Sequence, residues 1–332
     1  MDLGGHGHEP VLLDAVLALL APQPQQLLLD CTVGRGGHAE ALVAQMQPQG
    51  RLIAMDADPQ NLAYAKARLE RFGPDCRFFH ANFGEIADVL AAASAGKVDM
   101  LLADLGVSTN QILGGHHGLS FSSDESLDMR LDPRITRTAA DLVASLSEKE
   151  LADLIYHYSQ EHLSRRIARK IVEIRRTTPI TTTGQLAELI RQVAPRHHAG
   201  QINPATRTFQ ALRMAVNQEL ESLTSLLEAI PAFMAPGGRV AIISFHSGED
   251  RLVKQTMRSW CDQGVAQRLT KKPVVAGEAE LFANPRSRSA KLRVVRFADV
   301  NASRPVDKNI PRPAGSSKNK SASFELSDAD DE

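Results

Sequence analysis

A glycine-rich turn between a buried strand and a helix is the feature that most constrains the fold of this chain. Residues 27–30 form an apolar run ending in an aspartate, residues 34–37 read Gly-Arg-Gly-Gly, and a helical pattern occupies residues 38–46. In such a turn the backbone N–H groups approach a ligand closely, and the positive end of the helix points toward it. The sequence therefore predicts a cofactor site at the end of this strand.

Strand and helix signals alternate along most of the chain. Strands are predicted at residues 27–30, 51–56, 77–80, 98–104, 239–245 and 292–297, and helices at 38–46, 59–72 and 249–260. Residues 235–238, which read Ala-Pro-Gly-Gly, are predicted to form a turn before the fifth strand. The alternation indicates an α/β fold with a Rossmann-like, mostly parallel sheet covered by helices on both faces.

Helix signals replace this alternation between residues 111 and 212. Ser147 and Glu150 have the spacing of a capping box, which begins a helix. A single long helix is predicted from Asn203 onward, because apolar residues repeat on one face throughout residues 209–227. The pattern indicates an all-helical insertion in the sheet.

Three parts of the chain are expected from these patterns. They are a discontinuous sheet domain (residues 1–110 and 213–300), an inserted all-helical domain that recognises the substrate (111–212) and a disordered tail (301–332). The tail is rich in Ser, Asn, Asp, Lys and Pro, so it carries too little apolar surface to fold.

Composition places the chain among cytoplasmic globular proteins. Its 332 residues are 43% hydrophobic, yet no stretch approaches the ~20 apolar residues that cross a bilayer. The first residues lack the basic and apolar regions of a signal peptide. Cys31, Cys76 and Cys261 are far apart, which argues against disulfides and a zinc site and fits a reducing compartment.

The formal net charge of −1 does not exclude a nucleic-acid substrate, provided that positive charge is concentrated locally. Two segments concentrate it. Their basic residues are Arg165, Arg166, Arg169, Lys170, Arg175 and Arg176, and Arg286, Arg288, Lys291, Arg293 and Arg296. These clusters permit RNA binding, although a solvated face is the simpler interpretation of either one.

Two predicted strands end in aspartates that suit a cofactor and a substrate amine. Asp56 closes the second strand, where a carboxylate would accept ribose hydroxyls, although a helix N-cap is the alternative. Asp104 begins Asp-Leu-Gly-Val-Ser, residues 104–108, at the end of the fourth strand. Methyltransferases that act on exocyclic amines place an acid and small residues there. Hydrogen-bond acceptors on the amine favour its more nucleophilic, pyramidal geometry.

Other polar residues are weaker candidates. His246 follows the fifth strand, at the edge where clefts of such sheets open, and it is a candidate for the catalytic pocket or a core-edge residue. Gln210, Arg213 and Asn217 lie on a polar stripe that, together with Arg207, would face RNA, or simply solvent. The pairs 116–117 and 197–198 are adjacent histidines without further ligands nearby, so no metal is expected.

Five blocks of the sequence resemble the MraW-type family of 16S ribosomal RNA methyltransferases (small subunit methyltransferase H). They are Gly34-Arg35-Gly36-Gly37-His38, residues 104–108, Leu127-Asp128-Met129-Arg130, residues 204–213 and Ser244-Phe245-His246-Ser247. The blocks occur in the family's order, and the resemblance spans nearly the whole folded chain, from His8 to Arg293. Departures from the family pattern concentrate in residues 109–119 and 159–162.

The resemblance implies a SAM-dependent enzyme that methylates N4 of a cytosine in the decoding region of 16S rRNA, with the small ribosomal subunit as its partner. It implies cofactor contacts from Gly36, Gly37, His38, Asp56, Phe83, Asp104 and Gln111. Asp104 and His246 are then the candidate catalytic residues, and Arg207, Gln210, Arg213 and Asn217 the candidate substrate-binding residues. Without the family, Phe83 is as consistent with the core as with an adenine ring.

Two other classes of protein stay open at this point. The glycine spacing also permits an NAD-dependent oxidoreductase, although no proton relay for hydride transfer is recognisable. The departures near residues 109–119 also permit an idle RNA-binding factor that retains the fold. A DNA or protein methyltransferase is a variant of the main interpretation, and a homodimer is left open.

Overall fold

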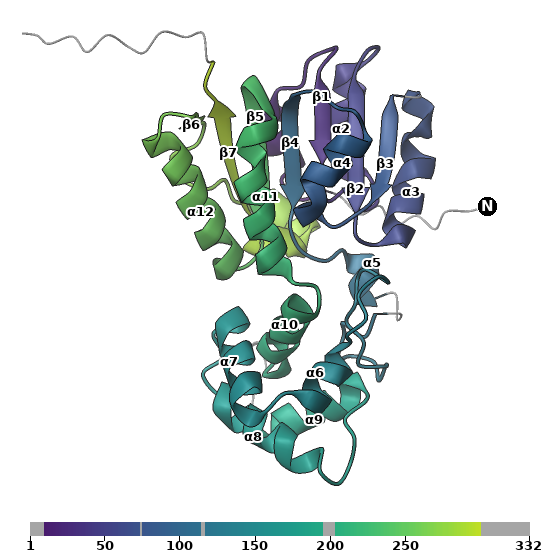
Figure 1. The fold of residues 1–332 in the computed structure, drawn as a ribbon, viewed down its shortest axis with the longest axis vertical. Coiled ribbons are helices and arrows are strands. Elements are labelled where there is room, and N and C mark those ends of the chain that lie inside the picture. Colours follow the sequence, from purple (N-terminus) through teal and green to yellow (C-terminus); the bar gives the residue numbers. More distant parts are fainter. Residues whose placement is uncertain (1–9, 74, 114–116, 195–202, 300–332) are drawn as a thin grey trace, which may run out of the picture. The chain divides into compact units, whose positions relative to one another are not determined.

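A seven-stranded sheet organises the computed structural model, which describes residues 10–73, 75–113, 117–194 and 203–299. The strand order is β3-β2-β1-β4-β5-β7-β6 (Figure 1). The strands are β1 (Leu27–Asp30), β2 (Arg51–Asp56), β3 (Cys76–His80), β4 (Val98–Asp104), β5 (Met234–Ser244), β6 (Ala266–Arg268) and β7 (Lys291–Phe297). Strands β1 to β5 are parallel, whereas β7 runs antiparallel to β5 and to β6. The order reverses between β1 and β4, which is where open α/β sheets bind their ligands.

Helices cover both faces of this sheet because both faces of its strands are apolar. Leu28 and the β4 residue Leu102 face one core cluster, and Leu29 and Leu101 face the other. The first cluster is packed by α1 (Leu13–Leu20), α2 (Gly37–Met46) and α3 (Pro59–Leu69). The second is packed by α4 (Ile86–Ala92), α11 (Glu219–Phe233) and α12 (Ser247–Asp262), which Figure 1 shows on one face. The prediction of a Rossmann-like α/β fold is confirmed.

Between β4 and α11, the described residues contain helices and no named strand. The helices are α5 (Thr109–Leu113), α6 (Ala139–Ser145), α7 (Glu148–Ser159), α8 (Ser164–Ile174), α9 (Thr183–Val193) and α10 (Ala205–Val216). Helices α6 to α10 share a third apolar cluster. The predicted capping box is present: Ser147 accepts from the Glu150 amide, and the Glu150 carboxylate accepts from the Ser147 amide.

The inserted helices are thus confirmed, but the boundaries predicted for separate domains stay a prediction. The described residues up to Asp299 form one compact unit. The remaining elements are α13 (Glu278–Ala283) and three 3-10 turns at Glu70–Phe72, Phe83–Glu85 and Pro285–Ser289. The predicted disordered tail and the histidines at 116, 197 and 198 lie outside the described residues.

Two local predictions are wrong. The single helix predicted from residue 203 is two helices, because the chain breaks at Asn217 and Gln218, where Gln218 has a φ of 49°. The predicted turn at residues 235–238 belongs to β5, which begins at Met234. Its pairing with β4 shifts register between Val98 and Met100, and this irregularity accommodates the glycines.

No helix in the described part of the chain combines the length and the apolar character that crossing a bilayer requires.

The break between α10 and α11 depends on the buried side chain of Asn217. Its Oδ1 accepts from the Leu131 amide at 2.8 Å, and its Nδ2 donates to the carbonyls of Met129 and Arg213, each at 2.8 Å. We expect Asn217→Ala to lower the free energy of unfolding by about 2 kcal/mol, because buried backbone groups lose their partners. Urea unfolding of Asn217→Ala beside Arg207→Ala, an exposed position on α10, measures this. Equal stability of the two variants would contradict the assignment.

Candidate active site

One cleft opens at the carboxyl ends of β1, β2 and β4. Among the residues that line it are six of the seven predicted cofactor contacts, namely Gly37, His38, Asp56, Phe83, Asp104 and Gln111. They come from separate elements and loops, and the sheet order brings their segments together. Gly36 is not among the lining residues, and its left-handed backbone conformation helps to form the turn instead.

The glycine turn needs its glycines for two different reasons. Gly34 and Gly36 have φ angles of 53° and 81°, in the left-handed region where residues with a Cβ are strained. At Gly37 the φ is ordinary, but a Cβ would lie 2.7 Å from Cγ of Pro10. The turn therefore leads directly from β1 into α2, with the helix amides beginning at the cleft.

Asp56 holds the glycine turn at the end of β2. Its Oδ2 accepts from the Gly34 amide and its Oδ1 from the Asp58 amide, both at 2.8 Å. The helix N-cap is Asp58, which accepts from the Gln60 amide, so the N-cap alternative for Asp56 is wrong. Burial raises the pKa of Asp56 to about 6, against the lowering effect of its two backbone donors.

Gln111 connects the loop after β4 to the same corner. Its Nε2 donates to Oδ2 of Asp58 at 3.0 Å, and its Oε1 accepts from the Ser108 amide at 2.8 Å. The His117 ring is partly buried and lies 3.7 Å from the same Asp58 oxygen. These bonds fix the loop of residues 105–111 over the cleft.

Asp104 lines the cleft and has one carboxylate oxygen without a hydrogen-bond partner in the described residues. Its Oδ1 is buried and has no hydrogen-bond partner within the described residues, and its Oδ2 lies 3.7 Å from Nδ1 of His38. Burial raises the pKa of Asp104 to about 7, while the positive charge of Arg286 lowers it and Glu249 raises it further. The site thus suits a ligand that brings a hydrogen-bond donor or a positive charge.

His38 beside it is a neutral ring. Its Nε2 lies 2.8 Å from the Val11 carbonyl, an acceptor, so this nitrogen carries the proton and Nδ1 faces Asp104 without one. Burial lowers the pKa of His38 to about 4. A proton held between the two groups therefore belongs to Asp104 rather than to His38.

Sequence reasoning missed two residues at this end of the sheet. Asp30 ends β1, is fully buried and accepts from the Thr32 amide at 3.1 Å, and burial raises its pKa to about 7. Its signal was available, because it closes a strand just as Asp56 and Asp104 do. Arg286 lines the cleft and donates to the Val107 carbonyl from the far end of the chain. Only the folded structure brings it there.

A second small pocket adjoins the first and shares Phe83, Leu105, Gly106 and Leu131 with it. Phe83 packs against the core and also lines both pockets. Its position therefore agrees both with a core residue and with a residue that contacts a ligand. The polar residues of this pocket are the carboxylates Glu219 and Glu249. Hydrogen-bond acceptors therefore line both the cleft and the pocket beside it.

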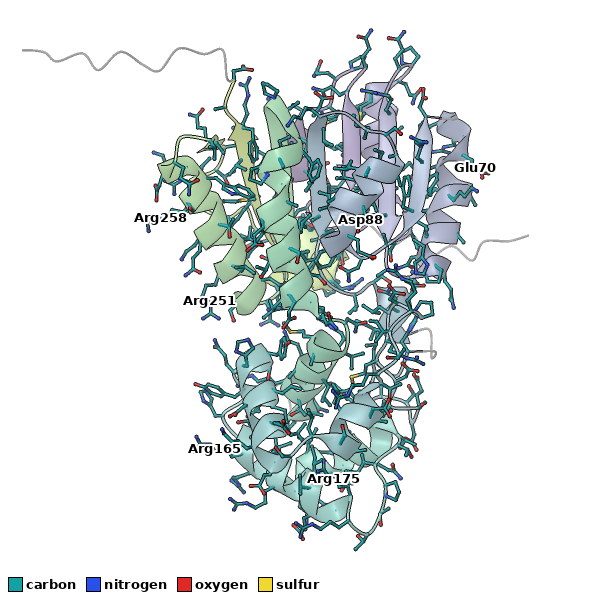
Figure 2. All side chains as sticks on the ribbon, viewed as in Figure 1. Glu70, Asp88, Arg165, Arg175, Arg251 and Arg258 are labelled. Carbon is teal, nitrogen blue, oxygen red and sulfur yellow. The ribbon has the colours of Figure 1, made fainter. Side chains whose placement is uncertain are left out.

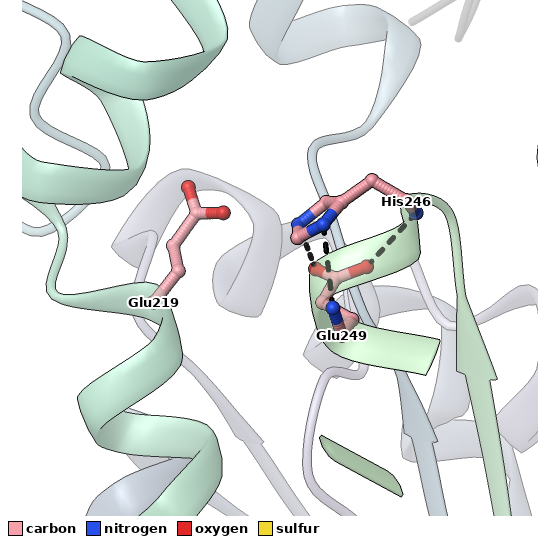
Figure 3. Close-up of side chains that lie close together, drawn as sticks. All are labelled: Glu219, His246 and Glu249. Atoms are coloured by element: carbon pink, nitrogen blue, oxygen red, sulfur yellow. Dashed lines mark hydrogen bonds and ion pairs between the residues drawn. The ribbon is translucent and has the colours of Figure 1, made fainter. Parts of the chain in front are cut away.

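His246 belongs to a hydrogen-bonded network rather than to the cleft wall. It is the N-cap of α12: its Nδ1 accepts from the Glu249 amide at 3.3 Å, and its Nε2 lies 3.0 Å from Oε1 of Glu249 (Figure 3). Ligand-type atoms of Glu219, His246 and Glu249 lie within 4.8 Å of one another. Arg213 bonds the Glu219 carboxylate, and Oε2 of Glu249 accepts from the Phe245 and His246 amides, whereas Nε2 of His246 has no hydrogen-bond partner in the described residues. We interpret the cluster as a network, and the absence of a metal stays a prediction.

The predicted substrate-binding residues have different surroundings. Arg207 is exposed and Gln210 is partly exposed on α10. Arg213 is largely buried and makes two bonds to the Glu219 carboxylate, at 2.7 and 2.8 Å, and Asn217 supports the break before α11. None of the four lines the main cleft, and their role in binding RNA stays a prediction.

The fold and the cleft are those of a Rossmann-like methyltransferase. One strand of the sheet, β7, is antiparallel to its neighbours, and the glycine turn faces strand-end carboxylates where the strand order reverses. The MraW methylase family matches residues 5–298, and the chain belongs to this family.

Curated relatives agree with this assignment. The ribosomal RNA small subunit methyltransferase H of Sorangium cellulosum is 47% identical over 88% of this chain and 91% of its own length. That of Acidobacterium capsulatum is 45% identical over 86% and 97%, respectively. A solved rRNA methylase of Streptococcus thermophilus covers 86% of this chain and 93% of its own, at 10% identity and a TM-score of 0.40. That likeness is too distant to add to the assignment.

The buried carboxylates predict how stability depends on pH. The folded protein keeps Asp30 and Asp104 protonated up to about pH 7, whereas the unfolded chain releases these protons near pH 4. The contribution of these two groups to stability without ligand should therefore fall as the pH rises from about 4 to 7. We expect Asp104→Asn to be more stable than the wild type above pH 7, with the difference vanishing toward pH 4.

Urea unfolding across this pH range, with Asp153→Asn on an exposed face of α7 as the control, checks the effect. An Asp104→Asn protein whose stability follows the wild type at every pH would show that the carboxyl group is not desolvated.

Proposed function

We propose that the protein transfers a methyl group from SAM to N4 of a cytosine in the decoding region of 16S rRNA. The observation that supports this most directly is the carboxyl group of Asp104, which lines the cleft and whose buried Oδ1 has no hydrogen-bond partner within the described residues. An acceptor in that position favours a substrate that presents an N–H group, as an exocyclic amine does.

The residues of the cleft fit SAM as the cofactor. The amides at the start of α2 and the glycine turn would approach its polar groups, and Asp56 would accept hydrogen bonds from its ribose hydroxyls. Phe83 offers an apolar surface for the adenine ring. When bound, SAM supplies an activated methyl group on a positively charged sulfonium. That charge favours the ionised form of Asp104, which is the better hydrogen-bond acceptor.

The acceptor oxygens of the site suit an amine better than a keto group. The lone pair of a cytosine amine is delocalised into the ring, so the amine is a weak nucleophile. Asp104 would accept one N–H bond and favour pyramidal geometry at nitrogen, and the carboxylates Glu219 and Glu249 line the adjoining pocket. A base with a keto group at that position would place an acceptor against the Asp104 carboxylate.

The proton balance assigns a second task to Asp104. As the N–C bond to the methyl group forms and the S–C bond breaks, the amine nitrogen must lose one proton. Asp104 receives it, because burial makes this carboxylate a stronger base than an exposed one. The unprotonated Nδ1 of His38 lies 3.7 Å from Oδ2 of the same carboxyl group and brings no proton of its own to it.

The assignment of RNA as the substrate is based on the names of the relatives. Those of Sorangium cellulosum and Acidobacterium capsulatum carry names that specify ribosomal RNA of the small subunit. We propose the small ribosomal subunit as partner and the cytoplasm as the place of action. Most of the rate acceleration would come from positioning the amine in line with the methyl group, since the sulfonium is already activated.

Calorimetric titration separates this proposal from an NAD-dependent oxidoreductase. We expect SAM to bind and NAD to give no heat, and we expect Asp56→Ala to weaken SAM binding through the loss of acceptors and of the glycine-turn bond. Asp75→Ala, at an acidic position before β3, is the control. Binding of NAD but not of SAM would overturn the cofactor assignment.

The role of Asp104 is tested by Asp104→Ala. We expect the rate of methyl transfer at saturating SAM to fall on the order of 100- to 1,000-fold, as when other preorganised hydrogen-bonding groups are removed. Single-turnover transfer of labelled methyl to small subunits measures the rate, and calorimetry measures SAM affinity separately. Unchanged transfer by Asp104→Ala, with Asp153→Ala as reference, would remove this residue from the mechanism.

A further inference from the structure

Helix α8 has one apolar face and one cationic face. Ile167, Ala168 and Ile171 are buried in the core that the inserted helices share. Arg165, Arg166 and Arg169 are exposed, and Figure 2 shows Arg165 directed away from the ribbon. The buried face explains why the helix forms, but it does not explain why three arginines occupy the opposite face.

Internal partners neutralise little of this charge. Arg169 lies 3.4 Å from Glu148 of α7, and both side chains are well exposed, so water screens the pair. Lys170 lies 3.5 Å from Glu173 one turn later. Arg165 and Arg166 have no hydrogen bond or ion pair with any residue that the structure describes.

The arrangement carries an electrostatic cost within the helix. Arg165 and Arg166 lie in the first turn, where the helix dipole is positive, and the N-cap residue Leu163 makes no side-chain cap. One acid lies at this end: the Glu161 carboxylate accepts from the Leu163 amide at 2.9 Å. Arg165 is followed by Arg169, and Arg166 by Lys170, each four residues later, and like charges at this spacing repel across the helix surface. A bound polyanion would relieve both effects at once.

We propose that the exposed face of α8, defined by Arg165, Arg166 and Arg169, binds phosphate groups of the RNA backbone. This inference rests on the proposed function, because it takes RNA as the substrate. The planar guanidinium groups suit phosphate oxygens, with which they form paired hydrogen bonds. The face as defined consists of arginines alone, without an aromatic ring on which a base could stack, so it positions the RNA and does not read its sequence.

Helix α12 supplies a matched comparison. Arg251 and Arg258 are also exposed arginines of one helix, and Figure 2 labels both. Helix α12 also carries acidic residues near its arginines. Glu249 and Asp250 lie in its first turn, and Arg258 lies 3.5 Å from Asp262. Replacing these two arginines changes the net charge by the same amount as replacing Arg165 and Arg166.

The test compares Arg165→Gln/Arg166→Gln with Arg251→Gln/Arg258→Gln. Binding to small subunits that lack the methylation is measured at several salt concentrations. We expect the α8 variant to lose affinity on the order of tenfold near physiological salt, and its slope of log affinity against log salt to fall by about 1 for each phosphate that it no longer binds. Its SAM affinity and its transfer rate at saturating subunits should match the wild type.

Two outcomes would overturn the inference: an unchanged salt slope in the α8 variant, or an equal loss in the α12 variant, which would assign the effect to net charge. Arg165→Lys/Arg166→Lys keeps the charge and should retain most of the slope. If the salt slope falls as expected while no N4-methylcytidine forms, the result supports phosphate binding by the α8 face and contradicts the proposed methylation.

Discussion

Three carboxylates clustered at the ends of β1, β2 and β4 are the constraint on which the rest of the site depends. Burial raises the pKa of Asp30, Asp56 and Asp104 to between about 6 and about 7. The glycine turn is bent so that its Gly34 amide reaches Asp56, and Arg286 is brought in from the far end of the chain. Among the described residues, Oδ1 of Asp104 has no hydrogen-bond partner, and Asp104 itself lines the cleft.

A second polar network connects the inserted helices to the sheet. Arg213 of α10 pairs with Glu219 at the start of α11, and Glu219 shares a pocket with Glu249 of α12. Glu249 in turn accepts from the Phe245 and His246 amides after β5. Helix α10, which shares an apolar core with α8, thus pairs with the start of α11, whose Glu219 lies beside the Glu249 that binds the end of β5.

The sequence predicted what local patterns determine and failed where distant contacts decide. Strand-end aspartates, the glycine turn and the Ser147 capping box each depend on neighbouring residues, and the structure contains all of them. The helix from residue 203 was predicted as one piece because its apolar repeat runs past Asn217. The bonds from Asn217 to Leu131 and Met129 end that helix, and they join residues 86 and 88 positions apart.

We propose that this site methylates the amine of one cytosine. Small ribosomal subunits lacking the modification are incubated with the protein and isotope-labelled SAM, and the digested 16S rRNA is analysed for labelled nucleosides. We predict labelled N4-methylcytidine at a single position in the decoding region. Label in another nucleoside would contradict the acceptor assigned to Asp104, and no label despite SAM binding would contradict methyl transfer to this RNA.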